Sequence, residues 1–78
     1  MAKTHKVKIL PQYFDAVMDR TKTAEVRYND SGYENGDWLV LEEWTGEYYT
    51  GFYIVRRIKA VYELNSMGLN GYVLICME

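Results

Sequence analysis

Hydrophobic and polar residues alternate along much of this chain with a period of two, the pattern typical of β-strands. In residues 5–10, Val7 and Ile9 alternate with lysines, which predicts a first strand. Pro11 then suits the first position of a helix, because the N–H that proline lacks would have no partner there. The apolar residues that follow recur at helical spacing and predict a short helix over residues 11–19.

A second, shorter alternation covers residues 24–28 and predicts a half-buried strand. On this strand we expect Ala24, Val26 and Tyr28 to pack against the core, while the charged residues between them leave from the opposite face. Residues 29–36 are dense in Asn, Asp, Ser and Gly, which predicts a loop.

The rest of the chain reads as three further strands. Residues 37–44 are apolar at both parities, as expected of a strand that is covered on both sides. A turn at residues 45–47 follows. Residues 52–64 are rich in Ile, Val and Tyr and predict a long, bent strand. Residues 65–71 then form a loop, and residues 72–77 a closing strand.

The predicted order of elements is β-α-β-β-β-β, in a single domain over residues 1–78. A domain of this size buries only about 60% of the surface of its unfolded chain, so its core is small. One short helix cannot cover a flat sheet, whereas a sheet curled into a barrel hides its apolar faces and its edges. The sequence therefore predicts the α+β class, mainly β, as a small barrel of about five strands with one short helix after the first strand.

Composition adds limits on the class of protein. The chain is 49% apolar and 26% charged, which is typical of globular domains. Cys76 is the single cysteine and cannot form an internal disulfide, and no stretch has the length and apolarity of a membrane span. We therefore expect a cytoplasmic protein with no membrane partner. With His5 as the single histidine, no familiar zinc-binding spacing exists, so no metal and no cofactor is predicted.

The formal net charge of −2 is unevenly distributed. Between Tyr28 and Val55 the chain holds six acidic residues and no basic one, and outside that block nine bases stand against five acids. If the fold gathers these bases, they form a positive surface that attracts phosphate; otherwise they are solvated faces of strands. The bases occur in three clusters: Lys3, Lys6 and Lys8; Arg20, Lys22 and Arg27; and Arg56, Arg57 and Lys59.

The most distinctive polar residues lie between Arg20 and Asp30, where Lys22, Glu25 and Arg27 have the spacing Lys-x-x-Glu-x-Arg. Arg presents a fork of donors that suits phosphate or carboxylate, and Lys a mobile charge. Such a set can bind a nucleotide, or Lys22 and Glu25 can act as a catalytic acid–base pair. It can also be a surface ion-pair group, worth about 0–1 kcal/mol.

The order of motifs resembles that of the ASCH domain family, and most closely a small bacterial and phage branch of unassigned function. The shared features are a short helix, RTKTAEVR at residues 20–27, an Asn-Asp pair, and a Gly-Asp pair that opens an apolar strand ending in Glu-Glu-Trp. ASCH domains belong to the PUA-like superfamily of β-barrels, and their hallmark is Gly-x-Lys-x-x-Glu-x-Arg after the first helix. The resemblance covers residues 4–77, but the position of the motif glycine holds Arg20.

The resemblance implies a cleft beside the helix, lined by Lys22, Glu25 and Arg27, and RNA binding as the general role. Some ASCH members instead look like small amidohydrolases that act on acetylated cytidine nucleosides and carry a Thr nucleophile where this chain has Glu25. A carboxylate cannot act as that activated hydroxyl. The resemblance therefore favours holding a ligand over cutting one.

Asp30 and Trp44 complete the predicted ligand-binding set. Trp44, beside a turn with two tyrosines, can stack a nucleobase or lie at the rim of the barrel. Three functions compete: an RNA- or nucleotide-binding module, which the sequence favours; a small amidohydrolase-like enzyme acting on a modified nucleoside; and a protein-interaction accessory domain that uses the acidic residues 30–47. The sequence decides neither whether catalysis occurs nor the oligomeric state.

Overall fold

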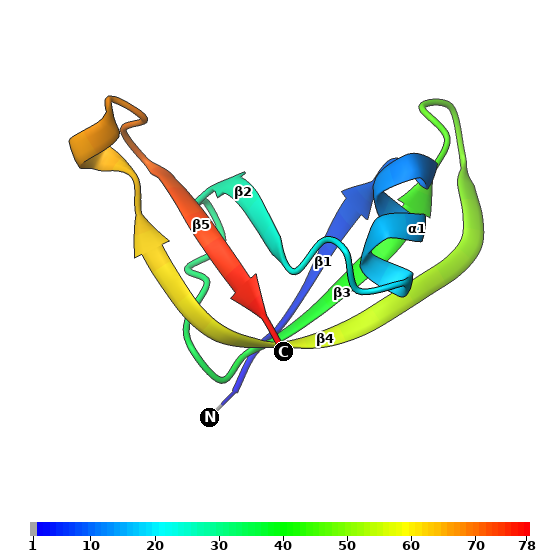
Figure 1. Ribbon diagram of the computed structural model, residues 1–78, viewed down its shortest axis with the longest axis horizontal. Helices are drawn as coiled ribbons and strands as arrows, with labels where there is room; N and C mark the ends of the chain where they lie inside the picture. Colours follow the sequence, from blue (N-terminus) through cyan, green and yellow to red (C-terminus); the bar gives the residue numbers. More distant parts are fainter. Residues whose placement is uncertain (1) are drawn as a thin grey trace.

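The alternating segments form five strands and the helical segment forms one α-helix, in a computed structural model that describes residues 2–78 (Figure 1). In chain order the elements are β1 (Thr4–Ile9), α1 (Pro11–Met18), β2 (Ala24–Tyr28), β3 (Trp38–Trp44), β4 (Tyr49–Glu63), the 3-10 helix η1 (Asn65–Met67) and β5 (Tyr72–Met77). The predicted strands and helix are confirmed. Strand β4 begins at Tyr49 instead of residue 52, because the N–H of Thr45 donates to the carbonyl of Tyr48 and closes a tight turn.

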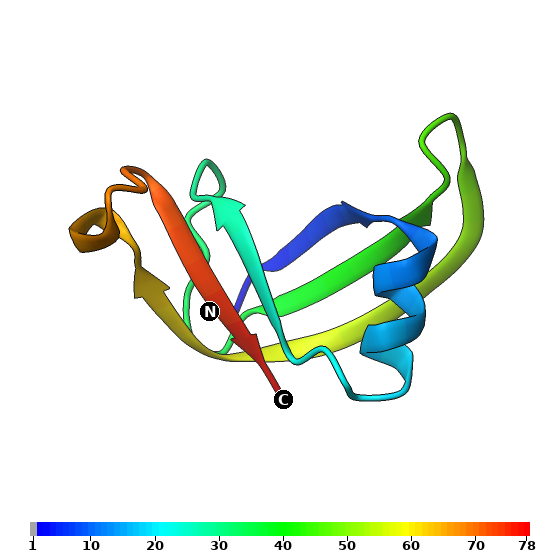
Figure 2. The ribbon, with the colours of Figure 1, turned by 45° about the horizontal axis from the view of Figure 1, so that its top comes forward.

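The five strands form one sheet in the order β1-β3-β4-β5-β2. Strand β1 pairs with β3 in parallel, and the other neighbours are antiparallel. The first part of β4 pairs with β3 as far as Arg57, and its second part pairs with β5 from Ile58 onward. The register shifts between Ile58 and Ala60, and β4 bends sharply between two arms of the sheet (Figures 1 and 2).

The sheet is not closed. Strands β1 and β2 are its two ends, and in residues 2–78 no backbone ladder joins them, so the predicted closure into a barrel is not present. A side chain stands where the ladder would be: Arg27 of β2 reaches across, and its Nη2 donates to the backbone carbonyl of Lys8 on β1. An arginine side chain between two strands holds them farther apart than the roughly 4.8 Å of a ladder.

The core lies on the concave side of the bent sheet. Helix α1 contributes Phe14 and Val17, which are three residues apart and so lie on one face of the helix. The buried apolar residues are Val7, Ile9, Phe14, Val17, Tyr33, Leu39, Leu41, Ile54, Ile58, Val73, Ile75 and Met77. In residues 2–78 no helix has the length and apolarity needed to cross a membrane.

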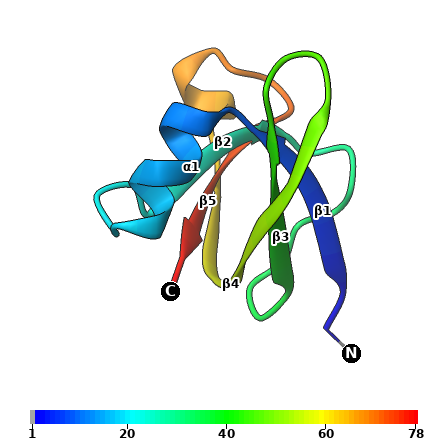
Figure 3. The same cartoon turned by 90° about the vertical axis from the view of Figure 1, so that its right-hand side faces the viewer.

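Strand β3 is covered on one face only, so the prediction of cover on both sides is wrong. Leu39 and Leu41 are fully buried, whereas Trp38 on the other face is 40% exposed. The reason is the single helix: α1 and the β2–β5 pair lie on the same side of β1 and β3 (Figure 3). Of the apolar residues of the second parity, Trp38 is therefore exposed, and Val40 and Trp44 are half-buried.

Candidate functional site

The link between α1 and β2 fixes the position of Lys22. Asp19 caps the end of α1, and the next residue, Arg20, has a φ of 72°, in the left-handed region that favours glycine. The hydroxyl and the N–H of Thr21 donate to the Asp19 carboxylate, at 2.7 and 2.9 Å, and lower the pKa of Asp19. The N–H of Lys22 then donates to the carbonyl of Ala16, so the chain turns back over the end of the helix before β2.

Replacing Arg20 by Gly is expected to raise the free energy of unfolding by about 1 kcal/mol. A non-glycine residue in the left-handed region costs about 1–3 kcal/mol, and about 0.5–1 kcal/mol of that gain is lost to the freedom of glycine in the unfolded chain. The change also removes a charge near Arg56, whose pKa is lowered by burial and then by Arg20. Urea unfolding of Arg20→Gly and Arg20→Ala separates the two effects, because alanine removes the charge but keeps the strain. No difference between Arg20→Gly and Arg20→Ala would contradict the role of the backbone.

Glu25 is the buried centre of the candidate site, with 7% of its surface exposed. Its Oε1 lies 3.2 Å from the Nζ of Lys22, and its Oε2 accepts a hydrogen bond of 3.1 Å from the Nε of Arg27. The Nζ of Lys22 also donates to the carbonyl of Ala24, at 2.8 Å. The three motif residues thus form one cluster, hereafter the Lys-Glu-Arg cluster, in which each carboxylate oxygen faces a cation.

Strand β2 presents to the core the face opposite to the predicted one. Val26 and Tyr28 are 53% and 57% exposed, whereas Glu25 is buried and pairs in register with the fully buried Ile75 of β5. The burial of Glu25 is tolerated because two cations compensate its charge. On the outside, the ring of Tyr28 is partly covered by Tyr72, with the ring centroids 5.4 Å apart.

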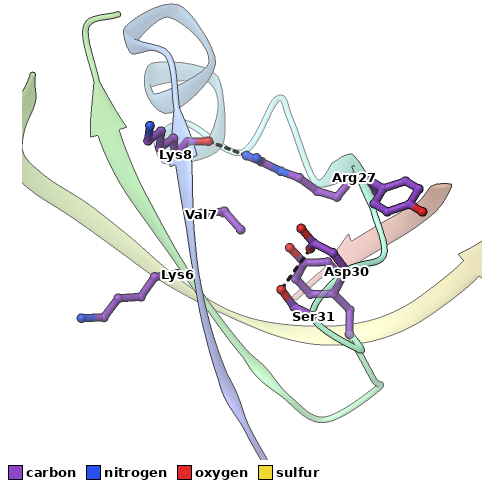
Figure 4. Close-up of a pocket in the computed structure, with 8 residues that line it drawn as sticks. Lys6, Val7, Lys8, Arg27, Asp30 and Ser31 are labelled. Carbon is purple, nitrogen blue, oxygen red and sulfur yellow. Dashed lines mark hydrogen bonds between the residues drawn. The ribbon is translucent and has the colours of Figure 1, made fainter. Parts of the chain in front are cut away.

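Arg27 leads from the Lys-Glu-Arg cluster into a pocket of about 340 Å³ between β1 and β2 (Figure 4). The side chains of Lys6 and Lys8 point away from Arg27, so β1 offers this pocket its backbone and the side chain of Val7. Asp30 accepts a hydrogen bond of 3.1 Å from the hydroxyl of Ser31, and adds a carboxylate to the guanidinium of Arg27. The lining residues are Lys6, Val7, Lys8, Arg27, Tyr28, Asp30, Ser31 and Tyr33.

The predicted ligand-binding residues fall in three places. Of the Lys-Glu-Arg cluster, only Arg27 lines the pocket, where it is joined by Asp30. Trp44 does not line the pocket. It packs edge-on against Tyr49, with the ring centroids 4.8 Å apart, and the Nζ of Lys8 lies 4.4 Å above its ring.

Sequence reasoning missed a second buried polar group, the pair His5 and Asp37. These residues are 7% and 3% exposed, and the Nε2 of His5 lies 2.7 Å from the Oδ2 of Asp37. Asp37 also accepts the backbone N–H groups of Lys3 and Glu34, at 3.0 and 3.2 Å. The pKa of Asp37 lies below its ordinary value, chiefly because of the hydrogen bond from the backbone N–H of Lys3 and secondly because of the hydrogen bond with His5. The ring of Tyr33 packs on His5, with the centroids 4.7 Å apart.

The burial of His5 has a signal in the sequence, because His5 has the same parity as Val7 and Ile9 on β1. Its partner has none, since Asp37 lies 32 residues away. Within the part of the chain that the structure describes, no group of three or more His, Cys, Asp and Glu side chains is arranged to hold a metal ion.

Comparison with known proteins gives the family. Residues 4–77 match the family described as "Domain of unknown function (DUF3850)", and the chain belongs to this family. It is also similar to a protein of Escherichia phage P2 described as "Uncharacterized 12.9 kDa protein in GpA 3'region", with 44% identity over 75 residues. The match covers 96% of this chain and 68% of the phage protein. Since neither description states an activity, function has to be argued from the site.

Proposed function

We propose that this chain is an RNA- or nucleotide-binding module of the ASCH type, and that the pocket between β1 and β2 holds one nucleotide. The observation that carries this proposal is Arg27, whose guanidinium is anchored by Glu25 and lines a pocket that Asp30 also lines. The volume of about 340 Å³ lies near the lower end of the range of small-molecule sites, about 300–1,000 Å³. A single nucleotide suits this volume better than a large cofactor.

Four features support the ASCH-type assignment. A helix follows the first strand, and the three polar residues of the motif converge. Arg20, at the position of the motif glycine, adopts the positive φ that glycine favours. The sheet also approaches the closed form expected of PUA-like domains, because the side chain of Arg27 connects its two end strands through the carbonyl of Lys8.

Arg27 and Asp30 offer a nucleotide two different anchors. A guanidinium binds phosphate oxygens through paired, charge-assisted hydrogen bonds. A carboxylate repels phosphate and accepts hydrogen bonds from a base, as Asp does from the amino group of cytosine. The phosphate is therefore assigned to Arg27 and the base to the side of Asp30, with Glu25 keeping the guanidinium in one orientation.

The two alternative functions have less support. In the hydrolase alternative Lys22 and Glu25 act on a modified nucleoside, but they pair with each other and neither lines the pocket. In the protein-interaction alternative residues 30–47 form an acidic working face. Of these residues, Asp37 is buried and Glu34 pairs with a lysine, so neither offers a free charge to such a face.

The paired exchange Arg27→Gln with Glu25→Gln is expected to weaken nucleotide binding about tenfold or more. It removes the guanidinium without leaving a buried, half-compensated carboxylate, and it leaves the net charge of the Lys-Glu-Arg cluster unchanged. Isothermal titration calorimetry with the four ribonucleoside 5′-monophosphates measures the loss. For the wild type we expect cytidine monophosphate to bind more tightly than uridine monophosphate, because only cytosine offers an amino group to Asp30.

A matched control is Lys3→Gln. The ammonium of Lys3 lies 3.6 Å from the carboxylate of Glu34 and does not line the pocket, so its removal should leave nucleotide affinity unchanged. Thermal unfolding of each variant checks that the fold survives. Absence of binding heat with all four monophosphates, or equal affinity in the wild type and the paired exchange, would rule out the pocket as a nucleotide site.

A further inference from the structure

A second surface of uncommon composition lies on the side of β1, β3 and β4 that faces away from α1. Its parity follows from the buried residues, because the inward positions of these strands include Val7, Leu39 and Ile54. The registers then bring the outward residues of the three strands beside one another. We call this surface the outer face and define it by Lys6, Lys8, Trp38, Trp44, Tyr53 and Arg57.

Large aromatic side chains are exposed to solvent on the outer face. Tyr53 is 63% exposed and Trp38 is 40% exposed, and between them Val55 is 43% exposed. Both tryptophans of the chain lie here. Contiguous exposed apolar residues of this kind on a small domain indicate a surface that meets a partner.

Cations accompany the rings. The guanidinium carbon of Arg57 lies 5.0 Å from the ring centroid of Trp38, and Lys8 lies over Trp44. No ion pair involves Lys6, Lys8 or Arg57 within residues 2–78. Glu42, next to Lys8 in the register, is one acid against these three bases, so the outer face is positive on a chain whose net charge is negative.

We infer that the outer face binds a single strand of nucleic acid, whose bases stack on Trp38 and Tyr53 and whose phosphates meet Lys6, Lys8 and Arg57. Interleaved rings and cations are the means by which sheet surfaces bind single strands. The charge decides against a second copy of the chain, since the same face on both copies would set three cations against three cations. A strand of phosphates complements them.

The outer face is separate from the nucleotide pocket. Strand β1 divides the two: its backbone and Val7 line the pocket, while the side chains of Lys6 and Lys8 point to the other side (Figure 4). The binding of a strand to the outer face therefore does not depend on the Lys-Glu-Arg cluster, and the two sites can be tested independently.

The test uses the tryptophans as reporters, because a base stacked on the outer face quenches their fluorescence. Titration of the protein with single-stranded decauridylate is expected to quench the emission, and Tyr53→Ala should weaken the binding about tenfold. The control is Tyr62→Ala, on the same strand, with 59% exposure but beyond the part of β4 that pairs with β3. It should leave the binding unchanged. Arg57→Gln should flatten the slope of log affinity against log salt by about 0.7.

Four results would overturn the inference. The first is binding of a ten-base-pair RNA duplex, whose bases are not free to stack, with the same affinity as decauridylate. The second is an equal loss of affinity for decauridylate in Tyr53→Ala and Tyr62→Ala. Loss of quenching in the Arg27→Gln, Glu25→Gln protein but not in Tyr53→Ala would assign the strand to the pocket. A dimer in sedimentation that Tyr53→Ala dissociates, without any quenching by decauridylate, would assign the face to a second copy.

Discussion

Asp37→Ala is expected to lower the free energy of unfolding by about 3 kcal/mol. The substitution leaves the ring of His5 and the backbone N–H groups of Lys3 and Glu34 without their acceptor in a buried place, and each such loss costs about 1–3 kcal/mol. Urea unfolding, followed by tryptophan fluorescence, measures the loss. Asp37→Asn should cost less, because its amide oxygen still accepts one of these hydrogen bonds.

The control for Asp37 is Asp30→Ala. Asp30 is exposed and, within residues 2–78, accepts a hydrogen bond from Ser31 alone, so its removal should change stability by less than about 0.5 kcal/mol. Similar losses of unfolding free energy in Asp37→Ala and Asp30→Ala would mean that the buried His5–Asp37 pair stabilises the fold no more than an exposed aspartate does.

The same pair makes stability fall in acid. Because the pKa of Asp37 is lower in the folded protein than the ordinary value of 3.8, the folded state binds this proton less readily than the unfolded chain does. The contribution of Asp37 is therefore fully present above about pH 4 and is lost as the pH falls through the folded pKa. The stability difference between the wild type and Asp37→Asn should accordingly narrow below that pH.

The second large effect is expected at the Lys-Glu-Arg cluster. Replacing both Lys22 and Arg27 by Met leaves Glu25 buried without a cation, which should lower the free energy of unfolding by about 3 kcal/mol or more. Adding Glu25→Gln removes the stranded charge and should restore most of that loss. Urea unfolding of the three proteins measures both steps. A triple variant no more stable than the double would show that the charge of Glu25 is not the cause.

This effect also bears on how the site can be tested for binding. Removing both cations would weaken any ligand through loss of the fold as well as through loss of contacts. The exchange of Arg27 and Glu25 together avoids this loss of the fold, because it removes the buried carboxylate along with the guanidinium and leaves no buried charge without a partner.

Local patterns were sufficient to locate the elements. Pro11 begins α1 as predicted, and residues 24–28 and 72–77 match β2 and β5 residue for residue. The convergence of the motif residues was also accessible, because Glu25 and Arg27 are two apart on a strand and Lys22 follows the end of the helix. These are features of short range, where propensity and spacing decide.

The choice of face was not accessible in the same way. An alternating strand has the same pattern whichever side is buried, and Glu25 turns inward because of its two cations and because of Ile75, far along the chain. Likewise, the apolar residues of both parities in β3 gave no sign that only one side would be covered. That outcome depends on where α1 packs, and Trp38 remains outside with Arg57 over its ring.

The pairing of β2 has a consequence for the growing chain. In the described residues β5 is the sole strand that pairs with β2, and the N–H of Met77 donates to the carbonyl of Thr23 at the start of that pairing. A ribosome delivers Lys22, Glu25 and Arg27 long before it delivers β5, so during translation these side chains stay in water with no strand to hold them. The motif residues are therefore synthesised well before the strand that pairs with β2. A nascent or proteolysed chain that lacks residues 72–77 carries every residue of the motif but not the strand that pairs with β2.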